Sequence, residues 1–173
     1  DRVALLRPGY PAYRNTLAAL RLEPVEIHCG PEQEFHPTPA QLEALSPTPQ
    51  GFVIASPANP TGAMLDSRQL GALLTTCRAR GIQVISDEIY HGISFGKRAV
   101  SALELDSRAV VINSFSKLYR MPGWRLGWMI VPRDWAAQIH SYLINMFLTP
   151  STLAQHAAIA AMGLATFLMR AGG

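Results

Sequence analysis

Short apolar runs alternate along this chain with segments whose apolar residues recur at helical spacing. The continuous runs predict six strands, at residues 2–6, 24–28, 51–56, 83–87, 109–114 and 126–131. The segments with helical spacing predict five helices, at residues 12–21, 38–45, 66–80, 134–147 and 152–169. Strands this apolar are typical of a parallel sheet that is covered on both faces. The pattern therefore predicts an α/β fold with three layers, α/β/α, around a mostly parallel sheet.

Two of the predicted helices carry capping signals in their first turn. Thr38 is followed by Pro39 and then by Gln41, which is the spacing of a capping box with proline at the first helical position. Asp66 and Gln69 repeat that spacing, and Gly81 is a stop signal after the second helix. These signals predict where both helices begin and where one of them ends.

Polar side chains lie at or just beyond the ends of three predicted strands. Asn59 follows the third strand, Asp87 ends the fourth, and Ser114 ends the fifth with Lys117 close behind. Ligands of open α/β sheets bind beyond the carboxyl ends of the strands. We therefore expect three separate segments to bring polar groups to one edge of the sheet.

Lysine is rare in this chain, which has 13 arginines but only Lys97 and Lys117. Arginine keeps its proton, whereas a lysine can lose one and then attack a carbonyl carbon. A general bias toward arginine explains the same counts, so composition alone assigns no role to either lysine.

Composition indicates a folded single domain. The 173 residues are 49% apolar and 16% charged, which excludes an intrinsically disordered chain. The net charge is only +3 and the arginines are scattered, so we expect no nucleic-acid partner.

The cysteines and the apolar segments bear on the cellular compartment. Cys29 and Cys77 form no motif, which indicates reduced thiols and a cytoplasmic protein. Arginines interrupt the N-terminal stretch, so we expect no signal peptide. The most apolar run, residues 153–169, contains Gln155 and His156. We interpret it as a helix packed closely inside the protein, and we expect no membrane span.

Three segments resemble, in order and spacing, the signatures of class I and II aminotransferases, which are pyridoxal-phosphate enzymes of the aspartate aminotransferase fold. They are "SPANPTGAML" (56–65), "SDEIYHGISF" (86–95) and "SFSKLYRMPGWRLGW" (114–128). The upstream segment "RPGYPAY" (7–13) resembles the family's aromatic segment. The resemblance covers almost the whole chain, and the combination of motifs is far more specific than any one of them.

The resemblance implies a pyridoxal-phosphate site made of Tyr10, Asn59, Asp87, Tyr90, Ser114, Lys117 and Arg125. Lys117 is then the amine of the Schiff base. A free lysine has a pKa near ~10.4, so it needs desolvation or a neighbouring cation to react at neutral pH. Arg125, together with Ser114, is expected to hold the phosphate and is a candidate for that cation.

The remaining residues of the implied site contact the cofactor ring. Asp87 keeps the pyridine nitrogen protonated, which lets the ring withdraw electrons from the substrate; its alternative role is to cap the following turn. Asn59, after which the family often has a cis bond to Pro60, and Tyr90 hydrogen-bond the phenolic oxygen. Tyr10 stacks on the ring. Core packing is the alternative for both tyrosines.

Several other residues receive no role at this stage. Tyr13 is a weaker candidate that we interpret as packing, and Glu88 as a structural companion of Asp87. The five histidines show no metal-binding spacing, and we interpret them as structural or solvated: His28, His36, His91, His140 and His156. Trp124 and Trp128 are interpreted as packing residues.

Two features depart from the family pattern. Position 120 is usually small but is Arg120 here, which puts the fine geometry near the lysine in doubt. The family's upstream phosphate-binding turn and its small domain, with the arginine that binds the substrate carboxylate, have no counterpart in the sequence. We expect residues 1–173 to be a pyridoxal-phosphate-binding large domain that lacks an N-terminal segment and the C-terminal small domain.

The implied activity is transfer of an amino group between an amino acid and a 2-oxo acid, by a homodimer. Tyr90 favours this reaction, because relatives that condense acyl thioesters commonly have histidine near that position. Elimination at the β-carbon, decarboxylation and cyclisation remain open within the same resemblance. A ligand-sensing domain of a bacterial transcription regulator also remains open, since such domains can keep the cofactor site.

Overall fold

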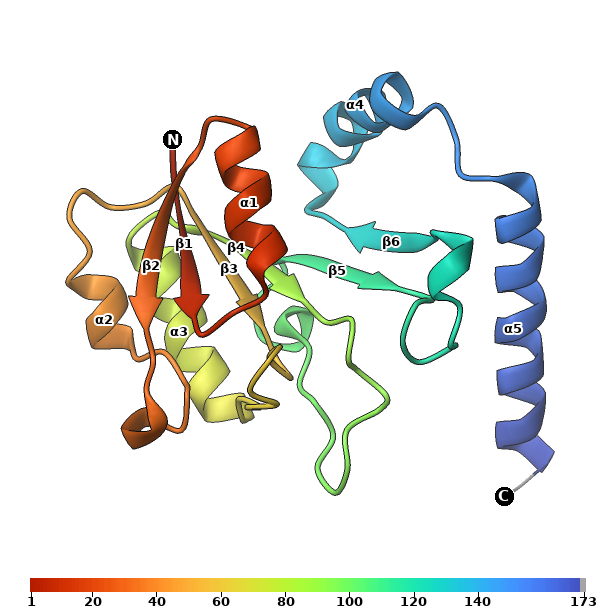
Figure 1. Cartoon of the computed structure of the whole chain (residues 1–173), viewed down its shortest axis with the longest axis horizontal. Helices are drawn as coiled ribbons and strands as arrows, with labels where there is room; N and C mark the ends of the chain where they lie inside the picture. The colour runs from red at the N-terminus through yellow and green to blue at the C-terminus, as the bar shows by residue number, and fades with distance from the viewer. Residues whose placement is uncertain (172–173) are drawn as a thin grey trace.

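In the computed structural model, which describes residues 1–171 and the side chains of residues 1–166, six strands form one sheet (Figure 1). They are β1 (Arg2–Arg7), β2 (Glu23–His28), β3 (Gly51–Ala55), β4 (Gln83–Asp87), β5 (Val110–Ser114) and β6 (Gly127–Ile130). Their order across the sheet is β2-β1-β3-β4-β5-β6. The first five are parallel to one another, and β6 runs antiparallel to β5. The mostly parallel sheet is therefore confirmed.

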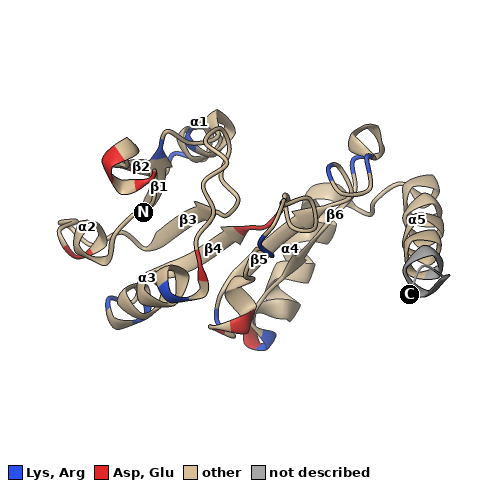
Figure 2. Ribbon diagram, turned by 90° about the horizontal axis from the view of Figure 1, so that it is seen from below, with Lys and Arg blue, Asp and Glu red and all other residues tan. Residues whose placement is uncertain are grey.

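Helices cover both faces of the sheet. The α-helices of the described chain are α1 (Pro11–Ala19), α2 (Pro39–Glu43), α3 (Ser67–Ala79), α4 (Ala136–Phe147) and α5 (Thr152–Ala171). Short 3-10 helices occupy Pro31–Gln33, Ala102–Glu104, Pro122–Trp124 and Arg133–Trp135. Helix α1 lies on one side of the strand layer and α3 on the other (Figure 2), while α2 packs beside α3. This arrangement is the predicted α/β/α order.

Both predicted capping boxes are present. The Gln41 backbone N–H donates to Thr38 Oγ1 at 3.3 Å, and the Thr38 N–H donates to Gln41 Oε1 at 2.9 Å. The corresponding distances in the box of Asp66 and Gln69 are 2.7 and 2.9 Å. Each box satisfies two N–H groups at the helix start that have no partner within the helix.

The apolar core lies between the central strands and α3. Phe52 and Ile54 of β3 are almost fully buried, as are Leu70 and Leu73 of α3. Interiors this tightly packed resist displacement, so the core holds β3 and β4 in place and thereby fixes the direction in which their carboxyl ends point.

The C-terminal third of the chain differs from the sequence prediction. We expected the helix at residues 152–169 to pack closely inside the protein. That prediction was wrong for the large apolar side chains, because Leu153, Ile159 and Leu164 are 74%, 68% and 61% exposed, whereas the small Ala154 and Ala158 are buried. Helix α5 stands apart from the sheet (Figure 1). Apolar character shows that a surface gains from being covered, but it does not show which segment covers it.

No helix of the described residues combines the length and the apolar character needed to cross a membrane.

Candidate active site

The carboxyl ends of β3, β4 and β5 lie side by side, because these strands are parallel neighbours in the sheet. Asn59 lies four residues beyond β3, and Asp87 is the last residue of β4. Ser114 is the last residue of β5, and Lys117 follows three residues later. The structure thus brings the three polar segments to one edge of the sheet, as the sequence predicted.

Asp87 is partly buried and both of its carboxylate oxygens have a donor. The Tyr13 hydroxyl donates to Oδ2 at 2.5 Å, and the Ile89 backbone N–H donates to Oδ1 at 3.1 Å. The second contact is the turn cap that we gave as the alternative role of this residue. A carboxylate accepts up to about four hydrogen bonds, so Asp87 keeps acceptor capacity for a ligand.

Tyr13 belongs to this site, although the sequence analysis interpreted it as a packing residue. Burial, followed by the hydrogen bond to Asp87, raises the pKa of the Tyr13 phenol far above its ordinary value. The hydroxyl therefore remains a donor at all physiological pH values. Its position was the available signal: Tyr13 lies three residues after Tyr10, in the first turn of α1.

Tyr10 lies just beyond β1 and contacts Tyr13 edge to face. Their ring centroids are 5.5 Å apart and the planes meet at 84°. Tyr10 is 46% exposed, so part of its surface is free to contact a ligand. Its proposed stacking on a cofactor ring stays a prediction.

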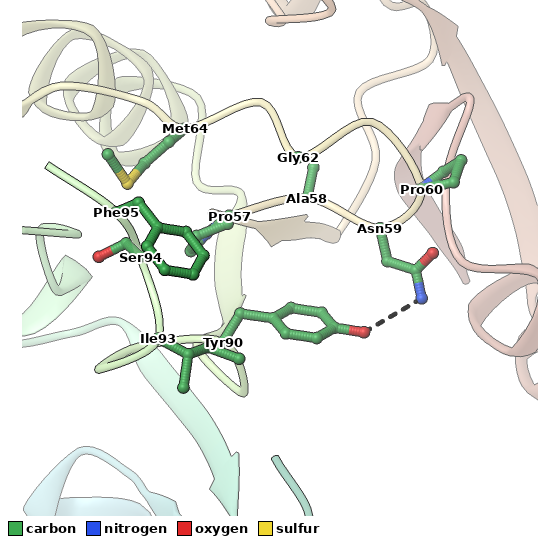
Figure 3. A pocket seen from close by; sticks show the side chains of 10 residues that line it. All are labelled: Pro57, Ala58, Asn59, Pro60, Gly62, Met64, Tyr90, Ile93, Ser94 and Phe95. Atoms are coloured by element: carbon green, nitrogen blue, oxygen red, sulfur yellow. Dashed lines mark hydrogen bonds between the residues drawn. The ribbon is translucent and has the colours of Figure 1, made fainter. Parts of the chain in front are cut away.

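Asn59 and Tyr90 lie in hydrogen-bond contact. The Asn59 amide Nδ2 points toward the Tyr90 hydroxyl oxygen at 3.3 Å (Figure 3). The peptide bond between Asn59 and Pro60 is cis, as we expected. Both residues border a hollow of about 510 Å³. The hollow is lined by Pro57, Ala58, Asn59, Pro60, Gly62, Met64, Tyr90, Ile93, Ser94 and Phe95.

Lys117 lies on an exposed turn that contacts the segment after β4. Its Nζ is 5.8 Å from the centroid of the Tyr90 ring, a distance at which a cation and an aromatic face attract each other. Gly92 has φ +84°, and a Cβ there would lie 2.9 Å from a methyl carbon of Leu118. The lysine turn and the Tyr90 turn therefore lie against each other.

The pairing of β5 with β6 brings Arg125 back toward Ser114. Ser114 is paired with Gly127, and the Phe115 N–H donates to the Leu126 carbonyl at 3.1 Å. A Cβ at Gly127 would come within 2.6 Å of a backbone oxygen of β5, so this close pairing requires glycine.

The polar groups of Ser114 and Arg125 have only local partners among the described residues. The Ser114 hydroxyl accepts a bond from the Ser116 N–H at 3.1 Å, and the Arg125 guanidinium donates to the Pro122 carbonyl at 2.9 Å. The Arg125 side chain is exposed, so its remaining donors are accessible to an anion.

Arg120 takes part in the lysine turn through its backbone. Its N–H donates to the Lys117 carbonyl at 3.0 Å, and its φ of 54° lies in the left-handed region. The side chain is exposed. The family usually has a small residue at this position. Arginine is accommodated here because its charged side chain lies in solvent.

Glu88 is 4% exposed and is held by donors from two segments. Its Oε1 accepts bonds from Ser86 Oγ at 3.1 Å, Ser101 Oγ at 3.0 Å and the Ala102 N–H at 2.8 Å. A buried carboxylate needs such partners, since unpaired burial is costly. Glu88 thus has the structural role that we inferred, and it anchors the turn that follows Asp87.

Comparison with known proteins gives a single family. The family model for aminotransferases of class I and II matches residues 1–170. The chain belongs to this family. Aminotransferases of class I and II use pyridoxal phosphate, and the family match agrees with the resemblance carried by the three sequence segments.

Individual relatives agree with this assignment. Over 163 residues the chain is 45% identical to a valine–pyruvate aminotransferase of Mycobacterium tuberculosis, a match covering 93% of this chain and 42% of the relative. An aspartate aminotransferase of Geobacillus stearothermophilus is 34% identical with the same coverage. The crystal structure of a putative aminotransferase from Silicibacter pomeroyi superposes with a TM-score of 0.92 at 46% identity, covering 98% of this chain and 45% of that one.

The chain spans less than half the length of these aminotransferases, 42% for both curated relatives. That residues 1–173 form the large domain of a longer enzyme stays a prediction.

Proposed function

We propose that the protein containing this chain is a pyridoxal-phosphate-dependent aminotransferase, and that this chain carries the cofactor site and the reacting amine. The observation that carries the proposal is the convergence of Asn59, Asp87 and Lys117 from three neighbouring strand ends. Tyr90 links them, because it contacts Asn59 at 3.3 Å and lies 5.8 Å from the Lys117 Nζ.

The donor and acceptor set of the site fits pyridoxal phosphate. When bound, this cofactor supplies an aldehyde that bonds to an amine and a pyridine ring that withdraws electrons. Asp87 would accept a hydrogen bond from the ring nitrogen, and its negative charge would keep that nitrogen protonated. The Asn59 amide and the Tyr90 hydroxyl would donate to the phenolic oxygen. Tyr10 would contact the ring face.

Groups around the lysine turn would hold the phosphate. The Ser114 hydroxyl and the Arg125 guanidinium are donors with free capacity, and a guanidinium binds phosphate oxygens in a bidentate manner.

Lys117 would carry the chemistry. Its Nζ is the nucleophile that would hold the cofactor through its aldehyde. When it is not bonded to the cofactor, Nζ would remove the proton from the substrate α-carbon as a general base and return it as a general acid. Transfer of the amino group leaves a 2-oxo acid.

Replacement of Lys117 tests the proposal. Lys117→Ala should abolish the covalent bond, so that borohydride reduction no longer attaches the cofactor to the protein, as read by intact mass and by visible absorbance. Lys97→Ala is the matched control because Lys97, the other lysine of the chain, is also exposed. Covalent attachment that persists in the Lys117 variant would exclude the assignment.

The amino donor is proposed from the relatives. The 45% identical relative is named a valine–pyruvate aminotransferase, so we propose valine as donor and pyruvate as acceptor. Incubation with each amino acid plus pyruvate, followed by detection of the 2-oxo acid and alanine, decides the point. Ammonia released without an acceptor would indicate elimination instead.

We further propose a cytoplasmic homodimer. The two cysteines are unpaired and buried, as expected of a reducing compartment. Large apolar side chains of β6 and α4 are exposed, which a second subunit would cover. Light scattering of the intact protein measures the oligomeric state.

A further inference from the structure

His91 lies between two acceptors that come from different segments. Its Nε2 is 2.9 Å from the Ser56 carbonyl oxygen, and its Nδ1 is 3.3 Å from Glu88 Oε2. Ser56 and Glu88 are 5% and 4% exposed. The side chain of His91 is 18% exposed, so this is a mostly buried contact that solvent does not replace easily.

Both partners of the ring are fixed independently of His91. Glu88 Oε1 is held by three donors, which leaves Oε2 to face the histidine. The Ser56 hydroxyl accepts a bond from the Leu65 N–H at 2.9 Å. A carbonyl oxygen only accepts hydrogen bonds, so Nε2 is the donor in the bond to Ser56.

Together with the bond between Asn59 and Tyr90, this contact joins the segment after β3 to the turn after β4 at two places. Ser56 begins the segment that carries Asn59, and His91 directly follows Tyr90 in sequence. At one end the segment is bonded to His91, and at the other end the Asn59 amide is bonded to the Tyr90 hydroxyl. Two adjacent side chains of the β4 turn thus hold both ends of the segment after β3.

We propose that His91 is a positioning residue, which holds residues 56–59 against the β4 turn so that Asn59 and Tyr90 present their donors to the same atom of the cofactor. The inference rests on the proposed function, since that atom is the phenolic oxygen of pyridoxal phosphate. In the described part of the chain no hydrogen bond or ion pair joins His91 to Lys117 or Asp87, so its effect passes through Ser56 and Glu88.

Two substitutions of His91 distinguish its contact with Ser56 from its contact with Glu88. In His91→Gln the amide nitrogen occupies the place of Nε2 and can still donate to Ser56. In His91→Asn it occupies the place of Nδ1 and reaches only Glu88. His140→Asn is the control because His140 is exposed on α4.

The first readout needs no cofactor. Hydrogen exchange is measured on the intact protein for the amides of Ala58, Gly62 and Leu65, which donate to Ala63, Ala58 and Ser56. Loss of the Ser56 bond should speed this exchange roughly tenfold in His91→Asn, with little change in His91→Gln or the control. Equal exchange in the Asn and Gln variants and in the unmodified protein would overturn the proposal.

The second readout separates positioning from a purely structural role. With pyridoxal phosphate bound, the pH midpoint of the visible absorbance should move upward in His91→Asn and return in His91→Gln. A phenolic oxygen with fewer donors keeps more negative charge and holds the neighbouring proton more tightly. Faster exchange with an unchanged midpoint would refute the positioning role.

The measurements distinguish failure of the proposed function from failure of the contact that we assign to His91. If the unmodified protein forms no visible complex with pyridoxal phosphate, the proposed function fails, and the role of His91 toward the cofactor is refuted with it. The exchange measurement still decides whether His91 holds residues 56–59.

Discussion

Tyr13 and Asp87 form the hydrogen bond at the carboxylate of the candidate site. They are 74 positions apart in sequence, yet the Tyr13 hydroxyl lies 2.5 Å from the Asp87 carboxylate. Asp87 was predictable because a carboxylate at the end of a buried strand requires a partner. The identity of that partner depends on how α1 lies over the sheet, which no local pattern states.

Tyr13→Phe removes this hydrogen bond and keeps the ring. We expect the fold to persist and the affinity for pyridoxal phosphate to fall about tenfold or more, since a hydrogen bond to a charged group contributes roughly 1.5–3 kcal/mol. Titration of the apoprotein with cofactor, followed by absorbance, measures the change. Tyr142→Phe is the control because Tyr142 is 62% exposed on α4. Unchanged affinity in the Tyr13 variant would argue that the bond is incidental.

At the scale of elements, local chemistry accounts for helix starts better than for strand partners. The capping boxes of Thr38 and Asp66 could be predicted because all their groups lie within four consecutive residues. The box of Ser101 and Glu104 was not predicted. Strand β2 includes Pro24, which is tolerated because β2 is at the edge of the sheet. The antiparallel direction of β6 was not predicted, since an apolar run has no direction.

Asp66→Ala tests the contribution of one cap. The Asp66 side chain accepts the Gln69 N–H at 2.7 Å at the start of α3, whose buried face contributes to the core. We expect a loss of about 1 kcal/mol in the free energy of unfolding, the usual contribution of an N-cap. Urea unfolding measures it, with Ser67→Ala at the next exposed position as control. Equal midpoints for the two variants would contradict a capping role.

At the scale of the whole molecule, burial is uneven. The parallel strands and α3 enclose a continuous core, whereas β6 and the last two helices expose large apolar side chains. The two cysteines lie in the enclosed part, where burial raises the pKa of the Cys29 thiol to about 11 and of the Cys77 thiol to about 12. They are therefore protonated and inert near neutral pH.

We predict that the folded protein resists alkylation by iodoacetamide at pH 8 and becomes reactive at both cysteines when unfolded in urea, as counted by mass spectrometry. The same shifts set an alkaline limit on stability. Because the folded pKa values exceed the unfolded value of about 9, the thiols contribute stability that is fully present below pH 9. This contribution is lost progressively as the pH rises to about 12. Rapid labelling of the native protein at pH 8 would show that these sites open locally.

The sequence alone determined the strands and α-helices, the capping boxes of Thr38 and Asp66, and the residue types of the candidate site except Tyr13, because spacing and side-chain chemistry are local properties. It also determined the family, through three motifs in order. Only the tertiary structure decided which groups meet: Tyr13 with Asp87, Asn59 with Tyr90, and His91 with Ser56. These pairs join segments 31 to 74 residues apart. Their contact follows from the order in which strands pair, and strand order is set by the packing of the whole sheet rather than by any one segment.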